Sequence, residues 1–152
     1  MATERLTAQR ASASAEPGRS LLRAMGAELD AVYGTEEVLS GAPADFAGPG
    51  DAFLVVSDGG RPVACGGIKR LDDRTGEIKR MYVVPEARGR GVARALLGFL
   101  EGTARELGYT RVRLDTGDRQ PHARALYVSA RYAPIDDYNA NPAASFWFEK
   151  AL

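Results

Sequence analysis

The sequence predicts an α/β fold, with a mixed, largely antiparallel sheet, a parallel central β–α–β unit and flanking helices. Strand-like runs joined by short turns fill residues 53–84, a rhythm typical of an antiparallel meander. A helical pattern and another short strand follow, and strands joined through a helix pair in parallel. At 152 residues the chain has the length of one domain, so we expect residues 1–152 to form a single unit.

The N-terminal third contains one clear element. Residues 3–11 carry a weak strand pattern. After Pro17, apolar residues recur at the spacing of one helix face as far as Gly34, which stands just past the last turn. Residues 40–51 are dense in Gly and Pro and therefore indicate a loop.

The middle of the chain predicts the meander. Its strands are Phe53–Ser57, Val63–Leu71 and Glu77–Val84, separated by turns rich in Asp and Gly. The pair Gly66 and Gly67 inside the second strand indicates a bulge or a close approach of another group to the backbone.

Helices and strands alternate in the second half of the chain. Gly98 and Gly102 weaken the first of these helices by about 1 kcal/mol each relative to Ala, which suggests close packing there. The predicted elements are helix Gly91–Leu107 with Gly108 at its end, strand Arg111–Asp115, helix Gln120–Ala130 and strand Ser145–Lys150.

Charge and composition exclude several classes of protein. Lys plus Arg and Asp plus Glu both number 20, so the net charge is zero and a nucleic-acid partner is not expected. The single cysteine, Cys65, cannot form an intramolecular disulfide. Residues 1–18 lack the apolar core of a signal peptide, and no apolar run reaches the ~18–20 residues of a membrane helix. We therefore expect a cytoplasmic protein that does not enter a membrane.

The stretch Arg88-Gly89-Arg90-Gly91-Val92-Ala93 lies between a predicted strand and a predicted helix. Glycines there let the backbone turn tightly and aim successive N–H groups at one point. The following helix adds a partial positive charge and unpaired N–H donors at its N-terminus. A local basic cluster surrounds the turn, which indicates a site for a small polyanion such as a pyrophosphate; it consists of Lys79, Arg80, Arg88, Arg90 and Arg94.

Competing phosphate motifs do not fit this stretch. A dinucleotide fingerprint needs a third glycine where Arg94 stands, and the nucleoside triphosphatase loop has no match in the chain. A strand–glycine turn–helix junction also occurs without any ligand, so a purely structural turn stays open as an alternative.

Two separated blocks resemble the GNAT superfamily of N-acetyltransferases. The family hallmark [QR]-x-x-G-x-[GA] is met by Arg88, Gly91 and Ala93, within a run over residues 76–97 that resembles the whole acetyl-CoA segment. Residues 120–132 resemble the later family helix with its A-x-x-L-Y core, although Arg131-Tyr132 replaces the usual G-[FY]. The resemblance covers about residues 50–150 and implies a GNAT-like fold and acetyl transfer to an amine.

The resemblance implies that acetyl-CoA is the acyl donor and assigns its contacts. The pantetheine arm would pair, like an added strand, with the backbone of Met81, Tyr82 and Val83. Gln120 stands where the family often has Asn, and its amide would hydrogen-bond the cofactor. The pyrophosphate would be held by the N–H groups of Arg88, Gly89, Arg90, Gly91, Val92, Ala93 and Arg94.

Two residues are candidates for catalysis. Tyr127 falls where the family has a tyrosine near the thioester sulfur, and a phenol with a pKa of about 10 can protonate a leaving thiolate. Glu77 matches the catalytic Glu of several family members and would accept the proton of the amine directly or through water. For Tyr127, the alternative is an aromatic side chain packed in the core. For Glu77, it is an exposed carboxylate at a strand edge that pairs with a Lys or Arg.

Other reactive side chains are given no catalytic role. His122 is the only histidine and has no carboxylate partner at a suggestive spacing, so we expect neither catalysis nor a metal site there. Cys65 lies in a strand pattern and is expected to be a small core residue.

The acceptor is a small-molecule or peptide amine that the resemblance does not identify. We expect it to enter opposite the cofactor, past Tyr33, residues 40–51 and Asp136–Tyr138, where the pair Asp136 and Asp137 would suit a cation. The alternatives are a non-catalytic acyl-CoA-binding or sensor domain and an inert structural or partner-binding domain. A possible homodimer would pair through the aromatic C-terminal strand.

Overall fold

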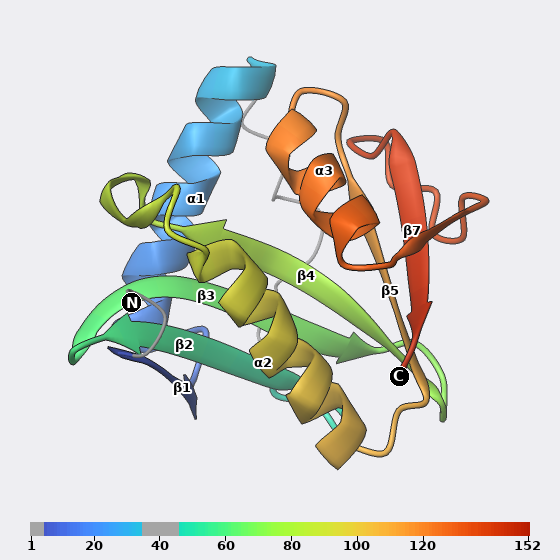
Figure 1. Ribbon diagram of the computed structural model, residues 1–152, viewed down its shortest axis with the longest axis horizontal. Helices are drawn as coiled ribbons and strands as arrows, with labels where there is room; N and C mark the ends of the chain where they lie inside the picture. The colour runs from blue at the N-terminus through green and yellow to red at the C-terminus, as the bar shows by residue number, and fades with distance from the viewer. Residues whose placement is uncertain (1–4, 35–45) are drawn as a thin grey trace.

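The computed structural model describes residues 5–34 and 46–152. It contains a seven-stranded sheet in the order β1-β2-β3-β4-β5-β7-β6 (Figure 1). Every neighbouring pair is antiparallel except β4 with β5, which is parallel. The predicted fold class is confirmed. The strands are β1 (Leu6–Arg10), β2 (Ala52–Asp58), β3 (Arg61–Arg70), β4 (Thr75–Val83), β5 (Arg111–Thr116), β6 (Ala133–Ile135) and β7 (Phe146–Ala151), and the helices are α1 (Gly18–Tyr33), 3₁₀ helix η2 (Pro85–Ala87), α2 (Val92–Glu106) and α3 (Pro121–Ser129).

Helices cover both faces of the sheet, and the alternation of β2 shows why. Leu54 and Val56 point into the larger core, which α2 and α3 cover. Phe53 and Val55 point to the opposite face, where Leu21 of α1 packs. Since successive side chains of a strand point to opposite faces, an apolar run such as that of β2 is buried from both sides. Figure 1 shows α1 behind the sheet and α2 in front of it.

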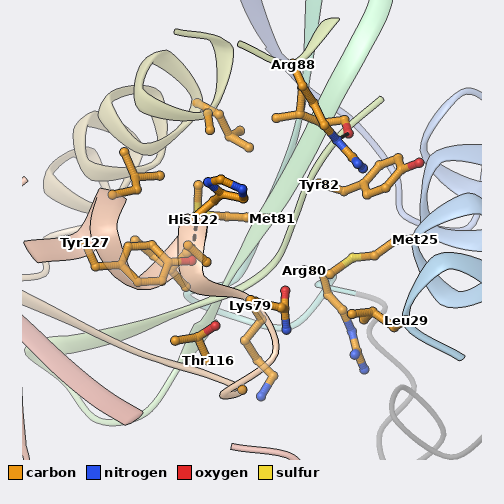
Figure 2. A pocket seen from close by; sticks show the side chains of 18 of the residues that line it. Met25, Leu29, Lys79, Arg80, Met81, Tyr82, Arg88, Thr116, His122 and Tyr127 are labelled. Carbon is orange, nitrogen blue, oxygen red and sulfur yellow. Dashed lines mark hydrogen bonds between the residues drawn. The ribbon is translucent and has the colours of Figure 1, made fainter. Parts of the chain in front are cut away.

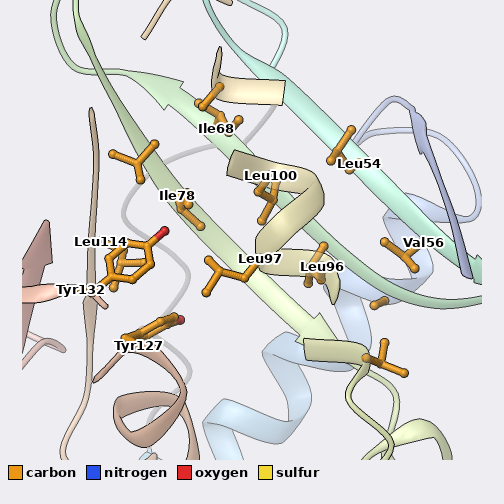
Figure 3. Packing of buried hydrophobic residues seen from close by; sticks show 14 of the residues in the cluster. Leu54, Val56, Ile68, Ile78, Leu96, Leu97, Leu100, Leu114, Tyr127 and Tyr132 are labelled. Carbon is orange, nitrogen blue, oxygen red and sulfur yellow. The ribbon is translucent and has the colours of Figure 1, made fainter. Parts of the chain in front are cut away.

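The larger core joins α2 to the centre of the sheet. Leu96, Leu97 and Leu100 of α2 are at most 1% exposed and contact the face that carries Ile68 and Ile78 (Figure 3). The rigid attachment of α2 fixes the position of its N-terminus relative to β4.

The glycines of β3 are closely surrounded by side chains, whereas those of α2 are not. A Cβ at Gly66 would lie 2.9 Å from Leu100 Cδ1, and one at Gly67 would overlap the ring of Phe46. The close approach predicted for the β3 pair is confirmed. The close packing predicted at Gly98 and Gly102 is wrong, because a Cβ at either position would meet no described atom within 4 Å.

The C-terminal part holds one difference from the sequence prediction. β6 was not predicted, since three residues that include Pro134 carry too short a pattern. β6 pairs with one edge of β7, and β5 pairs with the other. β5 covers one edge of β7 along its whole length and β6 covers the other over Trp147–Glu149, so dimer pairing through this strand stays a prediction.

Candidate active site

A cleft of about 800 Å³ opens where β4 and β5 separate. The two strands are paired only over Thr75–Glu77 and Arg111–Arg113, although β4 continues to Val83 and β5 to Thr116. The volume lies within the range of about 300–1,000 Å³ typical of small-molecule sites. Residues of α1, β4, the turn before α2, α3 and the chain before β7 line the cleft, which Figure 2 shows from close by.

The glycine-rich turn has the geometry of an anion site. Gly89 and Gly91 have φ angles of 78° and 80°, in the region that favours glycine. Gly91 is the N-cap of α2, and no side chain caps the helix. The N–H groups of the first turn therefore have no side-chain acceptor, and Gly91, Val92 and Ala93 line the cleft at the positive end of the helix dipole. A Cβ at Gly89 would meet no described atom within 4 Å, so there is room for a ligand beside the turn. These features fit a pyrophosphate.

Arg88 lies at this turn, but its side chain binds protein groups. Its two terminal nitrogens each donate to one oxygen of Glu28 in α1, both at 2.6 Å, and its Nε donates to the Val83 carbonyl at 3.0 Å. The hydrogen bonds with Glu28 raise the pKa of Arg88, and those with Arg88 lower the pKa of Glu28. The guanidinium of Arg88, a member of the predicted basic cluster, therefore joins α1 to the turn.

The remaining predicted cofactor residues lie around the cleft with one exception. Arg94 lines it and hydrogen-bonds Ser129 of α3. Arg90 is exposed and is not among the lining residues. The others that line the cleft are Met81, Tyr82, Val83, Arg88, Gly89, Gly91, Val92, Ala93 and Gln120.

Tyr127 of α3 and Met81 of β4 meet across the cleft. The Tyr127 hydroxyl lies 3.7 Å from Met81 Sδ and points toward β4 (Figure 2). Its ring packs against Tyr132 and Phe148, and the residue is 7% exposed. Burial, with a smaller contribution from the charge of Asp115, raises the pKa of Tyr127. The phenol therefore stays protonated at neutral pH, as a proton donor must.

A β-bulge in β4 was not predicted. Arg80 has a φ of 61°, and the pairing of β3 with β4 shifts register between Cys65 and Gly67. A bulge adds one unopposed residue and changes where the following side chains point. Met81 consequently packs with the α2 core, and Tyr82 packs on the α1 face.

Glu77 is buried behind the cleft. It is 6% exposed and is not among the described residues that line the cleft. Its carboxylate accepts hydrogen bonds from the Tyr138 hydroxyl at 2.6 Å and from Asn139 Nδ2 at 3.1 Å, and Lys79 Nζ lies 3.4 Å away. The exposure expected in the alternative interpretation of Glu77 is wrong, whereas its ion pair with Lys79 suits that alternative, in which the carboxylate pairs with a Lys or Arg. Burial and the bond to Glu77 raise the pKa of Tyr138.

Asp115 connects this buried network to the cleft. Asn139 Nδ2 donates to Asp115 Oδ2 at 2.6 Å and also to Glu77, so one amide bridges the two carboxylates. Asn141 Nδ2 lies 3.3 Å from both Asp115 oxygens. Asp115 and Asn141 line the cleft. The sequence offered one signal for Asp115: it alternates with the core residue Leu114 and so points away from the core.

Only some of the residues predicted for the acceptor side line the cleft. Tyr33 lines the cleft and accepts a hydrogen bond from Gln120 Nε2 at 3.3 Å, so Gln120 contacts α1. Asp136 and Asp137 are exposed and do not line the cleft; Asp137 accepts from two backbone N–H groups of its own loop. Of the predicted loop 40–51, residues 40–45 lie outside the described part of the chain.

Comparison with known proteins agrees with this geometry. Residues 19–131 match the model of the acetyltransferase (GNAT) family. This chain belongs to the GNAT acetyltransferase family. The match runs from α1 to the end of α3 and includes every described residue that lines the cleft except Asn141 and Ala143.

Individual relatives support the same assignment. The GNAT chain is 38% identical over 111 residues to an IAA acetyltransferase of Azospirillum brasilense, covering 70% of this chain and 72% of that one. It is 34% identical over 108 residues to an uncharacterised N-acetyltransferase of Bacillus subtilis (strain 168), covering 68% and 72%.

Solved structures share the fold over nearly the whole length. A Klebsiella pneumoniae protein described as an acyl-CoA N-acyltransferase has a TM-score of 0.77 at 28% identity, covering 97% of each chain. A GNAT family acetyltransferase of Elizabethkingia anophelis, solved with acetyl-CoA bound, has a TM-score of 0.72 at 14% identity, covering 98% of this chain and 99% of that one. At 14% identity, the second comparison shows a shared fold and no more.

Other reactive groups of this acetyltransferase are not assembled into a site. His122 is exposed at the rim of the cleft. Cys65 is fully buried, and burial raises the pKa of its thiol to about 12, which suits the expected core residue. Within residues 5–34 and 46–152, no group of His, Cys, Asp and Glu could hold a metal ion. No helix among these residues is long and apolar enough to cross a membrane.

Proposed function

We propose that this GNAT chain transfers the acetyl group of acetyl-CoA to a primary amine by direct attack in a ternary complex. The observation that carries the proposal is the meeting of the Tyr127 hydroxyl with Met81 in the gap between β4 and β5. A proton donor thus stands beside the strand on which the thioester arm would lie. The proposal treats residues 1–152 as one catalytic domain.

The chain offers a binding surface for each part of acetyl-CoA. The pyrophosphate binds the N–H groups at Gly89–Arg94, where the helix dipole adds favourable charge. The pantetheine arm pairs with the backbone of Met81–Val83, on the side of β4 that faces the gap. Bound in this way, the cosubstrate supplies an activated acetyl thioester near Tyr127.

Tyr127 acts as the general acid. The amine nitrogen attacks the carbonyl carbon, a C–N bond forms, and the C–S bond breaks. The departing sulfur takes the proton of Tyr127, and the phenol regains a proton from the nitrogen, which must lose one to become an amide. A raised pKa keeps Tyr127 in the protonated form that this step requires.

Glu77 acts as the base at a distance. An alkylamine arrives as an ammonium ion and must lose one proton before attack. Because Glu77 lies behind Asn139, the proton reaches its carboxylate through water rather than by direct contact. After transfer, this proton passes to solvent, so one ammonium ion and one thioester yield one amide, one thiol and one proton.

Binding of acetyl-CoA is tested by calorimetric titration of the wild type and of Gly91→Asp, with Gly98→Asp as the matched control on the same helix. We expect Gly91→Asp to abolish binding, because it adds strain and a negative charge where the N–H groups converge. Gly98→Asp changes an exposed position away from the turn and should bind normally. A wild type that does not bind acetyl-CoA contradicts both the transferase and the sensor alternative.

Turnover is tested by thiol release with a panel of primary amines: arylalkylamines such as phenethylamine, amino acids, polyamines, aminoglycosides and lysine peptides. Release with one class supports the proposal and identifies the acceptor. Binding of acetyl-CoA without release for any amine would favour the non-catalytic sensor domain. The proposal also retains the cytoplasmic location, which cell fractionation tests. It retains a possible homodimer through the C-terminal strand, which sedimentation tests.

A further inference from the structure

Asp115 differs from every other described residue that lines the cleft. It is the one carboxylate among them, whereas Lys79, Arg80, Arg88 and Arg94 contribute positive charge. It lies near the end of β5, beyond the last position that pairs with β4. A carboxylate at this place faces the gap through which donor and acceptor must meet.

Two asparagines hold Asp115 in a fixed orientation. Asn139 donates to Oδ2 at 2.6 Å, and Asn141 approaches both oxygens at 3.3 Å. Trp147 Nε1 donates to Asn139 Oδ1 at 2.9 Å, which forces the amide to turn its NH₂ group toward the carboxylates. Amides are neutral donors, so these bonds orient Asp115 and leave its negative charge in place.

The charge of Asp115 influences the pKa values of two other residues that line the cleft. It raises the pKa of the Tyr127 phenol, and its attraction opposes the lowering of the Arg80 pKa by burial. The carboxylate of Asp115 is therefore close enough to both Tyr127 and Arg80 to influence their pKa values. Glu77, by contrast, is separated from the cleft by Asn139 and meets no ligand directly.

We propose that Asp115 binds the ammonium group of the acceptor and positions its nitrogen beside the thioester. This assignment rests on the proposed transfer to an amine and deepens it. Asp115 recognises the charged form of the acceptor, while Glu77 behind it receives the proton. The carboxylate selects ammonium compounds over alcohols and thiols, because a neutral hydroxyl gains less from a charged partner.

The test compares Asp115→Asn with Asp118→Asn, an exposed aspartate that does not line the cleft. The acceptors are the panel amine with the fastest thiol release and its alkoxyamine analogue, in which oxygen replaces the CH₂ next to nitrogen. For phenethylamine, the analogue is O-benzylhydroxylamine. The two match in shape, but only the alkylamine is charged at neutral pH.

We expect Asp115→Asn to raise KM for the alkylamine by about 10- to 100-fold, the usual effect of losing a hydrogen bond to a charged group. KM for the alkoxyamine and the affinity for acetyl-CoA should stay within about twofold, and Asp118→Asn should resemble the wild type. Equal losses for both acceptors would mean that Asp115 only holds its loop and would overturn the assignment. An unchanged KM for the alkylamine would overturn it as well.

The assignment and the proposed function fail in different ways. If the wild type turns over and Asp115→Asn discriminates between the alkylamine and the alkoxyamine as the wild type does, only the assignment of Asp115 is contradicted. A wild type that binds acetyl-CoA but releases no thiol with any amine contradicts the proposed function, and the assignment falls with it.

Discussion

Tyr127 illustrates how burial prepares a single residue for chemistry. Its ring is enclosed by Tyr132 and Phe148, yet its hydroxyl reaches the cleft beside Met81. The low-dielectric surroundings disfavour the phenolate and raise the pKa of Tyr127. The same packing that makes this residue part of the core therefore also keeps its phenol protonated, so the two interpretations of Tyr127 are compatible.

Replacing Tyr127 by Phe should lower kcat by about 10²-fold or more, the usual contribution of a general acid. The acetyl-CoA dissociation constant should change little, because the ring and its packing remain. Steady-state kinetics with a calorimetric titration separates the two quantities. An equal loss of binding and turnover would reject the acid role of Tyr127.

Single residues also show where the sequence was a poor guide. The glycine turn and Tyr127 were predicted because their motif spacing is local. The partner of Arg88 was missed because Glu28 lies 60 positions away on α1. Asn139 likewise bridges Glu77 and Asp115 through contacts that exist only once three segments are assembled. Nothing in the spacing of these residues indicates that they meet.

At the level of elements, long periodic segments were predicted well and short irregular ones were not. α1 and α2 carry a full amphipathic pattern and were placed within a few residues of their bounds. β6 has three residues and was missed. The sequence does contain an indication of the β4 bulge. The adjacent charged residues Lys79 and Arg80 cannot both fit a strict alternation of polar and apolar side chains.

The glycines of α2 and β3 should respond oppositely to alanine. Gly98→Ala adds a methyl group in open space on a helix and should stabilise the protein by about 1 kcal/mol. Gly67→Ala drives a methyl group into the buried ring of Phe46 and should destabilise it by about 1–3 kcal/mol. Urea unfolding measures both free energies of unfolding. A Gly98→Ala variant less stable than the wild type would contradict the open surroundings of this position.

For the molecule as a whole, buried acidic groups that are neutral at pH 7 set the alkaline limit of stability. Burial raises the pKa of Cys65 to about 12 and raises the pKa values of Tyr127, Tyr132 and Tyr138. In the unfolded chain these groups titrate near their ordinary values of about 8.5 for Cys and 10 for Tyr. Above those values the unfolded state has lost protons that the folded state keeps, so the free energy of unfolding falls as pH rises.

We therefore expect the urea midpoint to be steady up to about pH 8 and to fall increasingly between about pH 9 and 11. Each such proton lowers the free energy of unfolding by about 1.4 kcal/mol per pH unit within its window. Tyr132→Phe removes one titrating hydroxyl, and the fall should be shallower in this variant. A midpoint that does not change up to pH 11 would contradict the raised pKa values.

The gap between β4 and β5 has a consequence for what this protein admits. Beyond Glu77, the edge of β4 that faces β5 is paired with no described strand, and unpaired backbone of this kind is what strands of other chains add to. Here the edge is recessed within the sheet, with α1 and α3 on opposite faces (Figure 1). A strand at the border of a sheet is open to another chain along its length, whereas this edge is reached through the cleft. The gap thus offers the backbone of β4 to a ligand that fits the cleft, rather than to the open border of another protein's sheet.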